Sequence, residues 1–200
     1  VFAMPFALIG FSLAVTKTEN AFSIRLLLLI ILCMIFARNA AMGFNRLADR
    51  KFDALNPRTK EREIPSGKIG TGSAAVFVIV NALLFVITTA FINNLTLILS
   101  PVALAVILGY SLTKRFTSLC HFILGLGLSL APIGAYISVT GRFDLLPLVY
   151  SFMVLTWSTG FDIIYALQDD KFDRDNNLHS IPSSSGRKKA LAISVAVHLL

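Results

Sequence analysis

Five long apolar runs limit what this sequence can fold into more than any other feature. They occupy residues 21–44, 70–92, 95–112, 120–139 and 145–165. A helix needs about 20 apolar residues to cross a bilayer core, and only helices and closed barrels satisfy their backbone hydrogen bonds there. Apolar residues make up 56% of the 200-residue chain and charged residues only 14%, unlike a soluble domain. We therefore expect an all-α, polytopic transmembrane helical bundle, an integral membrane protein that contacts the lipid bilayer.

Two shorter apolar stretches stand at the ends of the sequence. Residues 1–15 are too few for a complete span, and residues 190–200 stop within an apolar pattern. We interpret them as parts of two further helices. About seven helices would then be represented, with both ends of the bundle truncated.

The basic residues are distributed unevenly between the two sides of the predicted spans. Fourteen of the 18 Lys and Arg residues follow the runs at 21–44, 95–112 and 145–165, whereas only Lys17, Arg25 and Arg142 lie in the opposite segments. Positive residues mark cytoplasmic loops, so we expect these three segments, and the acids within them, to face the cytoplasm, in a bacterium across its inner membrane. Because this topology explains the net charge of +7, we expect no nucleic-acid partner.

Two acidic segments of the sequence are nearly identical. DRKFD at 49–53 returns as DDKFD at 169–173, and Ile-Pro-Ser follows each of them, at 64–66 and 181–183. Matched segments at such a distance indicate an internal duplication. We therefore expect a single transmembrane domain, residues 1–200, built from two similar multi-helix halves. Each half would carry one Asp-rich segment facing a shared site.

The spacing of the polar residues in both segments indicates a metal site. At helical periodicity each set shares one face: Asn45, Asp49 and Asp53 in the first, and Asp162, Tyr165, Asp169 and Asp173 in the second. Crowded carboxylates repel unless a cation lies between them, and oxygen ligands without nearby His or Cys favour Mg²⁺. We therefore expect Mg²⁺ as cofactor, bound by Asn45, Asp49, Asp53, Asp169 and Asp173. The alternative is a set of solvated loops whose charges neutralise one another.

Basic residues close to the acidic segments suit a phosphorylated substrate. Arg58, Lys60 and Arg62 follow the first segment, and Tyr110, Lys114 and Arg115 lie at the end of the run at 95–112. Substrate phosphate oxygens commonly complete the coordination of Mg²⁺, and Arg and Lys form strong hydrogen bonds with them. We predict that these six residues bind a diphosphate.

Four motifs, in this order, resemble the UbiA family of intramembrane prenyltransferases. They are NxxxDxxxD at 45–53, PRTxxRxxPSG at 57–67, YxxxK at 110–114 and DxxYAxxDxxxD at 162–173. The resemblance covers nearly the whole chain. It implies a nine-helix bundle whose two Asp-rich motifs face each other across a cavity, with Mg²⁺ between them holding an isoprenyl diphosphate. Many relatives have Asp directly after the motif's Asn, where this chain has Arg46; that position lies off the shared face, so no metal ligand should be lost.

Within the family the sequence looks most similar to the 4-hydroxybenzoate polyprenyltransferase type. This resemblance implies transfer of a polyprenyl group to a small aromatic acid, in the biosynthesis of ubiquinone or menaquinone. Asp162 or Tyr165 would be catalytic, orienting the phenol or taking its proton. Arg38, seven residues before Asn45 and therefore on nearly the same helix face, would bind the carboxylate of the acceptor. The alternative partner for Arg38 is Asp162, in an internal ion pair.

Other functions remain compatible with parts of the sequence. Another quinone precursor or a lipid alcohol could be the acceptor. A membrane CDP-alcohol phosphotransferase also uses Asp clusters and metal, but its Asp-Gly motif is missing. A cation-coupled transporter would carry its acids near mid-bilayer, whereas most of these lie at the ends of runs. His121, His179 and His198 lack metal-ligand spacing, and Cys33 and Cys120 are interpreted as packing residues.

Overall fold

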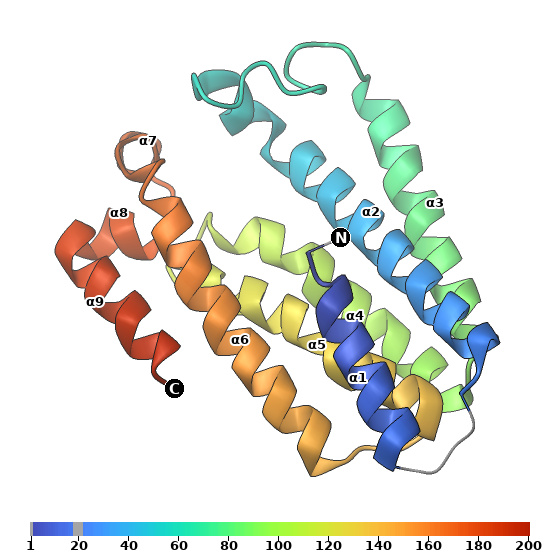
Figure 1. Ribbon diagram of the computed structural model, residues 1–200. Helices are drawn as coiled ribbons and strands as arrows, with labels where there is room; N and C mark the ends of the chain where they lie inside the picture. The colour runs from blue at the N-terminus through green and yellow to red at the C-terminus, as the bar shows by residue number, and fades with distance from the viewer. Residues whose placement is uncertain (1, 18–21) are drawn as a thin grey trace.

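The structure, a computed structural model, describes residues 2–17 and 22–200, which leaves the first residue of two predicted apolar regions, 1 and 21, outside it. The described residues form nine helices and no strand (Figure 1). The helices are α1 (Met4–Lys17), α2 (Ile24–Leu55), α3 (Thr71–Ala90), α4 (Asn94–Thr113), α5 (Cys120–Thr140), α6 (Leu145–Ala166), α7 (Asp170–Asp175), α8 (Ile181–Ser185) and α9 (Arg187–His198).

The helix lengths confirm the predicted fold class. Helices α2 to α6 are each long and apolar enough to cross a membrane, and α1 is a shorter apolar helix. Together with α9 they account for the seven predicted helices, and the short helices α7 and α8 lie in the connection between α6 and α9. The protein is an all-α, polytopic integral membrane protein.

Helix α5 lies at the centre of the bundle and packs against α1, α4 and α6 (Figure 1). Glycine makes two of these contacts close. A Cβ atom at Gly125 would lie 2.3 Å from Oγ1 of Thr159 on α6, and one at Gly10 on α1 would lie 2.0 Å from the carbonyl oxygen of Pro132. Small residues permit such approaches between helices in membranes. The position of α5 against α6, which matters for the site, therefore depends on Gly125.

Helix α2 continues beyond its apolar run as far as Leu55, and so carries the first acidic segment on one unbroken helix. Its end has a local cause. The residue before a proline is disfavoured in helical conformation, and Asn56, which precedes Pro57, is extended with φ −85° and ψ 120°. The chain then turns through the basic loop at 57–69 before α3 begins.

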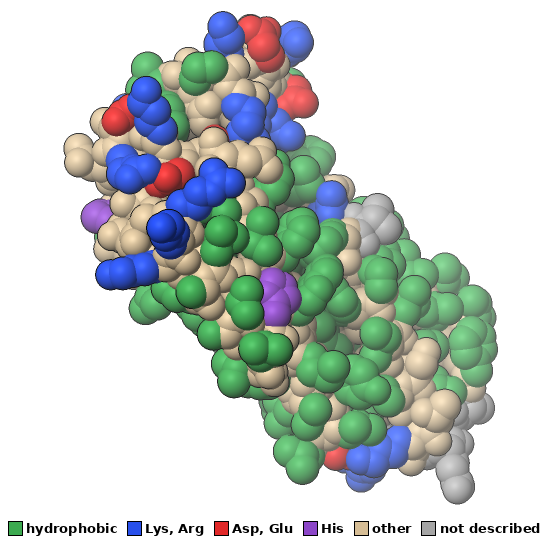
Figure 2. All heavy atoms as spheres, turned by 60° about the vertical axis from the view of Figure 1, so that its left-hand side comes forward, with side chains coloured by type: hydrophobic (Ala, Val, Ile, Leu, Met, Phe, Trp, Pro, Cys, Tyr) green, Lys and Arg blue, Asp and Glu red, His purple; other side chains and the backbone are tan. Residues whose placement is uncertain are grey.

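The surface is divided between charged ends and an apolar belt. Figure 2 shows Lys, Arg, Asp and Glu side chains gathered at one end, a green hydrophobic zone along the middle, and a smaller charged group at the other end. At the end remote from the acidic segments, Lys17 pairs with Asp144 at 3.0 Å. Cys33 and Cys120 are both buried and free, in agreement with a packing role.

Candidate active site between the two acidic segments

The two acidic segments line one polar cavity of about 260 Å³. It contains all five residues predicted to bind metal and both predicted catalytic residues. The predicted residues in its lining are Asn45, Asp49, Asp53, Arg58, Arg62, Tyr110, Lys114, Arg115, Asp162, Tyr165, Asp169 and Asp173. Lys60 is exposed and does not line this cavity, and Arg38 lies in the neighbouring one. The segments are therefore brought together as expected, with those two exceptions.

In the first segment the acids occupy successive turns of α2. The amide of Asn45 donates to Asp49 at 3.3 Å and to the Ser111 hydroxyl of α4 at 3.4 Å. Asp53 is 7% exposed, and Nη1 of Arg62 donates to its two carboxylate oxygens at 2.9 and 3.0 Å. The loop after α2 thus folds back to neutralise the acid at the end of that helix.

The second segment does not form the continuous helix that its spacing predicted. Helix α6 ends at Ala166, and α7 begins at Asp170. Between them the N–H groups of Leu167, Gln168 and Asp169 donate to carbonyls three residues back, the tightened pattern of a 3₁₀ turn that commonly ends a helix. The predicted single face from Asp162 to Asp173 is therefore wrong, although the carboxylates still converge on the cavity.

Asp169 and Asp173 differ sharply in their surroundings. Burial works against ionisation of Asp169, but hydrogen bonds from Arg58 and from Asn56 (3.0 Å) outweigh it and hold its pKa below the ordinary value. Asp173 is completely buried. Its burial raises its pKa, although Lys114 Nζ lies 2.7 Å from Oδ1 and the Ser180 hydroxyl donates to Oδ2 at 2.9 Å.

Two arginines connect the carboxylates to aromatic rings. Arg58, which is paired with Asp169, also lies over the ring of Tyr165 at 5.7 Å. Arg115 donates to the carbonyl of Ala48 at 2.7 Å, lies 3.5 Å from Asp49, and covers the ring of Phe52 at 5.8 Å. These cations are therefore held at the cavity by several weak contacts each.

The donor set of the polar cavity suits Mg²⁺. Five carboxylates and two carboxamides line it, and oxygen donors are the ligands that Mg²⁺ prefers. Each carboxylate is engaged by a neighbouring side chain, and in residues 2–17 and 22–200 no three His, Cys, Asp or Glu side chains are grouped closely enough to surround an ion. By its chemistry the site fits the ion, which would compete with Arg and Lys for the carboxylates.

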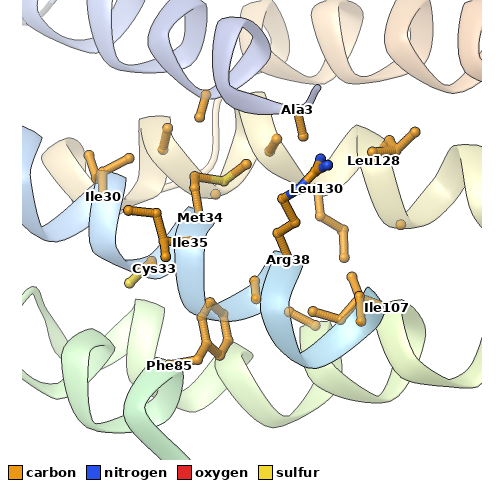
Figure 3. A pocket seen from close by; sticks show the side chains of 18 of the residues that line it. Ala3, Ile30, Cys33, Met34, Ile35, Arg38, Phe85, Ile107, Leu128 and Leu130 are labelled. Carbon is orange, nitrogen blue, oxygen red and sulfur yellow. The ribbon is translucent and has the colours of Figure 1, made fainter. Parts of the chain in front are cut away.

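A larger, mainly apolar cavity of about 520 Å³ adjoins the polar one, and Tyr110 and Leu124 line both. Figure 3 shows Arg38 extending from α2 into this space, where Met34 and Leu130 also line the wall. The predicted cavity for Arg38 was the one beside Asn45; the structure assigns Arg38 to the adjoining cavity instead. No hydrogen bond or ion pair of Arg38 occurs within the described ranges. The alternative ion pair between Arg38 and Asp162 is not formed, because Asp162 pairs with His121 instead.

Besides Ser180, sequence reasoning missed two side chains that bind acids of the site. Nδ1 of His121, at the start of α5, lies 2.6 Å from Asp162, and Asn56 donates to Asp169 across the cavity. Asn56 directly precedes the PRTxxRxxPSG motif, and its position was a usable signal. His121 has no metal-ligand spacing to another histidine, but it is a polar residue in the first turn of a span on the side of the acidic segments, and that signal was overlooked.

Comparison with known proteins gives consistent matches. The sequence matches the UbiA prenyltransferase family over residues 3–200. It is 30% identical to a 4-hydroxybenzoate octaprenyltransferase of Vesicomyosocius okutanii, over 78% of this chain and 57% of that protein. The corresponding enzyme of Tolumonas auensis is 33% identical over 76% of this chain and 52% of its own length. The chain spans a little over half the length of these curated relatives.

Solved structures share the fold. A UbiA homologue from Aeropyrum pernix K1, in its apo form, superposes with a TM-score of 0.90 at 33% identity, covering 99% of this chain and 74% of that one. A homologue from Archaeoglobus fulgidus, solved with DMAPP and Mg²⁺, gives a TM-score of 0.74 at 24% identity, over 98% of this chain and 74% of that one. At that lower identity the likeness concerns the fold alone.

Proposed function

Because the chain belongs to the UbiA prenyltransferase family, we propose that the protein transfers a polyprenyl group from an isoprenyl diphosphate to 4-hydroxybenzoate in quinone biosynthesis. One observation carries the proposal. Two acidic segments and four cations line a polar cavity that adjoins a larger apolar one, with Tyr110 and Leu124 common to both. A diphosphate with an apolar tail needs these two environments side by side.

The polar cavity would hold the diphosphate. Arg58, Arg62, Lys114 and Arg115 all line it, and each is paired with an acid, an arrangement that keeps the cations in position before substrate binds. Mg²⁺, bound by Asn45 and the Asp residues of both segments, would neutralise the diphosphate as it leaves. The cations would then exchange carboxylate partners for phosphate oxygens, for which Arg offers a planar, bidentate donor group.

The apolar cavity would hold the first part of the prenyl chain and the acceptor. Its lining combines aliphatic side chains of α2, α4 and α5 with a single Arg among the described residues. A cation in such surroundings favours an anionic partner. Arg38 would bind the carboxylate of 4-hydroxybenzoate, whose ring would then lie between Arg38 and the polar cavity, near Tyr110.

The reaction requires one bond to break, one to form and one proton to leave. The allylic C–O bond breaks and the diphosphate departs with the electron pair. A carbon of the phenol ring forms the new C–C bond with the allylic cation, and the same carbon then loses its proton. Asp162 or Tyr165, both in the lining of the polar cavity, would orient the phenol or accept a proton. The apolar walls would limit access of water, which would otherwise capture the cation.

We propose that the chain has the membrane orientation that its basic residues predict. The end that carries the acidic segments would face the cytoplasm across a bacterial inner membrane, because basic residues are concentrated there. The described helices would form one domain of two halves, one carrying α2 and the other α6 and α7. Single-cysteine labelling at Lys60 and at Arg142, from either side of sealed vesicles, would test the orientation.

A transfer assay tests the proposed function. The intact protein in membranes is incubated with a labelled polyprenyl diphosphate, Mg²⁺ and one acceptor from a panel that includes 4-hydroxybenzoate, another quinone precursor and a lipid alcohol. Labelled prenyl-hydroxybenzoate, lost on chelation of the metal, is expected. Transfer to a different acceptor would support the prenyltransferase activity but contradict the assignment of 4-hydroxybenzoate as the acceptor. Absence of transfer to every acceptor would reject the function.

A further inference from the structure

His121 uses both ring nitrogens to join two parts of the site. Nδ1 lies 2.6 Å from Oδ2 of Asp162 on α6. The backbone N–H of Ile181, the first residue of α8, donates to Nε2 over 3.2 Å. The ring is buried, with His121 only 2% exposed. His121 therefore touches the cavity mainly through the acid that it holds.

The two contacts together determine which ring nitrogen carries the proton. A backbone N–H can only donate, so Nε2 must be the acceptor and carries no proton. The proton is then on Nδ1, which donates it in the hydrogen bond to Asp162. In this tautomer the imidazole is neutral. The carboxylate of Asp162 keeps its second oxygen, Oδ1, available to the cavity that Asp162 lines.

Helix packing fixes the distance between the two side chains. His121 is one turn before Gly125 on α5, and Thr159 is one turn before Asp162 on α6. The absence of a side chain at Gly125 lets Thr159 approach closely, and the Thr159 hydroxyl donates to the carbonyl of His121 at 3.4 Å. The contact that brings α5 to α6 therefore also sets His121 against Asp162.

We propose that His121 is a positioning residue that holds Asp162 as an oriented carboxylate for the acceptor. The inference rests on the proposed function, in which Asp162 orients the phenol or takes a proton from it. A carboxylate on α6 alone could rotate about its side-chain bonds. The bond from His121, itself fixed by α8, would restrict that rotation and aim Oδ1 at the cavity.

Two substitutions separate the contacts of His121. In His121→Asn the amide nitrogen occupies roughly the place of Nδ1 and can donate to Asp162, but the side chain is too short for Ile181. In His121→Gln the amide oxygen reaches roughly the place of Nε2 and can accept from Ile181, without a donor for Asp162. The matched control is His179→Gln. His179 is exposed, lies in the connection between α6 and α9, and lines neither cavity.

Loss of the contact with Asp162 should lower kcat but leave the KM for the prenyl diphosphate donor unchanged. His121→Gln should lower kcat about 10- to 100-fold, less than the roughly 10²- to 10⁴-fold contribution of a whole acid–base group, because Asp162 itself remains. The donor KM should stay within about twofold of wild type. His121→Asn should restore most of the lost kcat. If both variants lose kcat equally, or if kcat follows the Ile181 contact, the proposal is overturned.

A spectroscopic measurement decides the inference independently of turnover. Nitrogen NMR of protein labelled at histidine should show a neutral ring protonated at Nδ1 whose signal vanishes in His121→Gln. His198, whose Nδ1 donates to the carbonyl of Ser194 at 2.8 Å, should give a second signal of this kind that the variant keeps. A ring at His121 protonated at Nε2, or at both nitrogens, would overturn the proposal even if the variants fail to fold. If the wild-type protein transfers no prenyl group, the proposed function fails, and the NMR result alone decides whether His121 holds Asp162.

Discussion

The two acidic segments repeat nearly the same sequence but hold their carboxylates in different ways. An offset of 120 residues aligns Asp49 with Asp169 and Asp53 with Asp173. The first pair lies on the unbroken helix α2, whereas the second is separated from α6 by a tight turn. Sequence spacing therefore identified the residues that reach the cavity, whereas the fold of each segment determines which residues they contact.

The segments also differ in where their cations come from. Asp53 is bound by Arg62 of its own loop, whereas Asp169 is bound by Arg58, which follows the other segment. Asp173 is bound by Lys114, which follows α4. The second segment therefore depends on cations from the loop after α2 and from the end of α4, and these contacts connect those elements across the cavity.

The same offset shows where the segments diverge. It aligns Asn45 with Tyr165 and places Asp162 opposite Met42. It also places Arg38 opposite Ser158, which is 1% exposed. The matched Asp residues are those proposed for the metal, whereas Arg38, Asp162 and Tyr165, proposed for acceptor chemistry, have no matching residue in the other segment. Asn45 is the one residue proposed for the metal that has no match. This division lets substitutions in the two segments be compared directly.

The largest effect is expected from removing one matched acid of each segment. Asp49→Ala and Asp169→Ala should each reduce turnover by about 10³-fold or more, since metal stabilisation of the leaving group is worth several kcal/mol. Initial rates in membranes measure this. Glu61→Ala and Asp175→Ala, at exposed acids outside the cavity, should keep wild-type rates. A near-normal rate in either cavity variant would contradict a shared metal site.

A smaller and more selective effect is expected from Arg38, which has no basic counterpart in the second segment. Arg38→Ala should raise the Kd for 4-hydroxybenzoate about 10- to 100-fold, the value of a charge-assisted pair. Binding of the prenyl diphosphate, measured by titration, should be unchanged. Arg38→Lys should give an intermediate loss because it keeps the charge without the planar donor group. An equal loss of donor binding would show that Arg38 belongs with the diphosphate residues.

Removing a cation that pairs with one acid of each segment sharpens the contrast further. Lys114→Ala and Arg115→Ala should both raise the donor KM about tenfold, as expected for loss of one phosphate contact. Only Lys114→Ala should also lower Tm markedly, because Asp173 is completely buried while the Asp49 side chain is 30% exposed. Lys171→Ala, at an exposed lysine of α7, is the control. Equal Tm values for the two variants would remove the distinction between the segments.

The smallest effect is expected from an acid outside both segments. Hydrogen bonds from Lys17 and Tyr136 lower the pKa of Asp144 to about 2. Since the folded pKa lies below the unfolded one, its contribution is full above the ordinary Asp pKa of about 3.9 and is lost as pH falls towards 2.

Asp144→Asn should therefore lower Tm by about 2 °C or less at pH 7, as for an exposed ion pair. The same difference is expected at pH 5, and it should shrink below about pH 4. Turnover should be unchanged. A difference that grows on acidification would contradict the sign of the pKa shift.

Much of the fold and most of the site could be predicted from the sequence. Apolar runs gave the five long spans because hydrophobic length is a property of contiguous residues. Convergence of Asn45, Asp49 and Asp53 followed from helical periodicity, which held because nothing interrupts α2 before Pro57. The prediction from the same periodicity was wrong beyond Ala166, where no Gly or Pro in the sequence indicates a turn. The pairing of Asp169 with Arg58 and Asn56 favours this turn over a continuous helix.

The sequence by itself determined that this chain crosses a membrane as helices, which ends carry charge, and which acids form the two repeated segments, because each of these is written in local composition and spacing. Only the tertiary structure decided which side chains pair with these acids. Arg58 meets Asp169 across 111 positions of sequence, and His121 meets Asp162 across 41. Such contacts depend on how closely helices pack, as Gly125 allows against Thr159, and on where a loop returns. Those geometries arise from the whole bundle and are not present in any single segment.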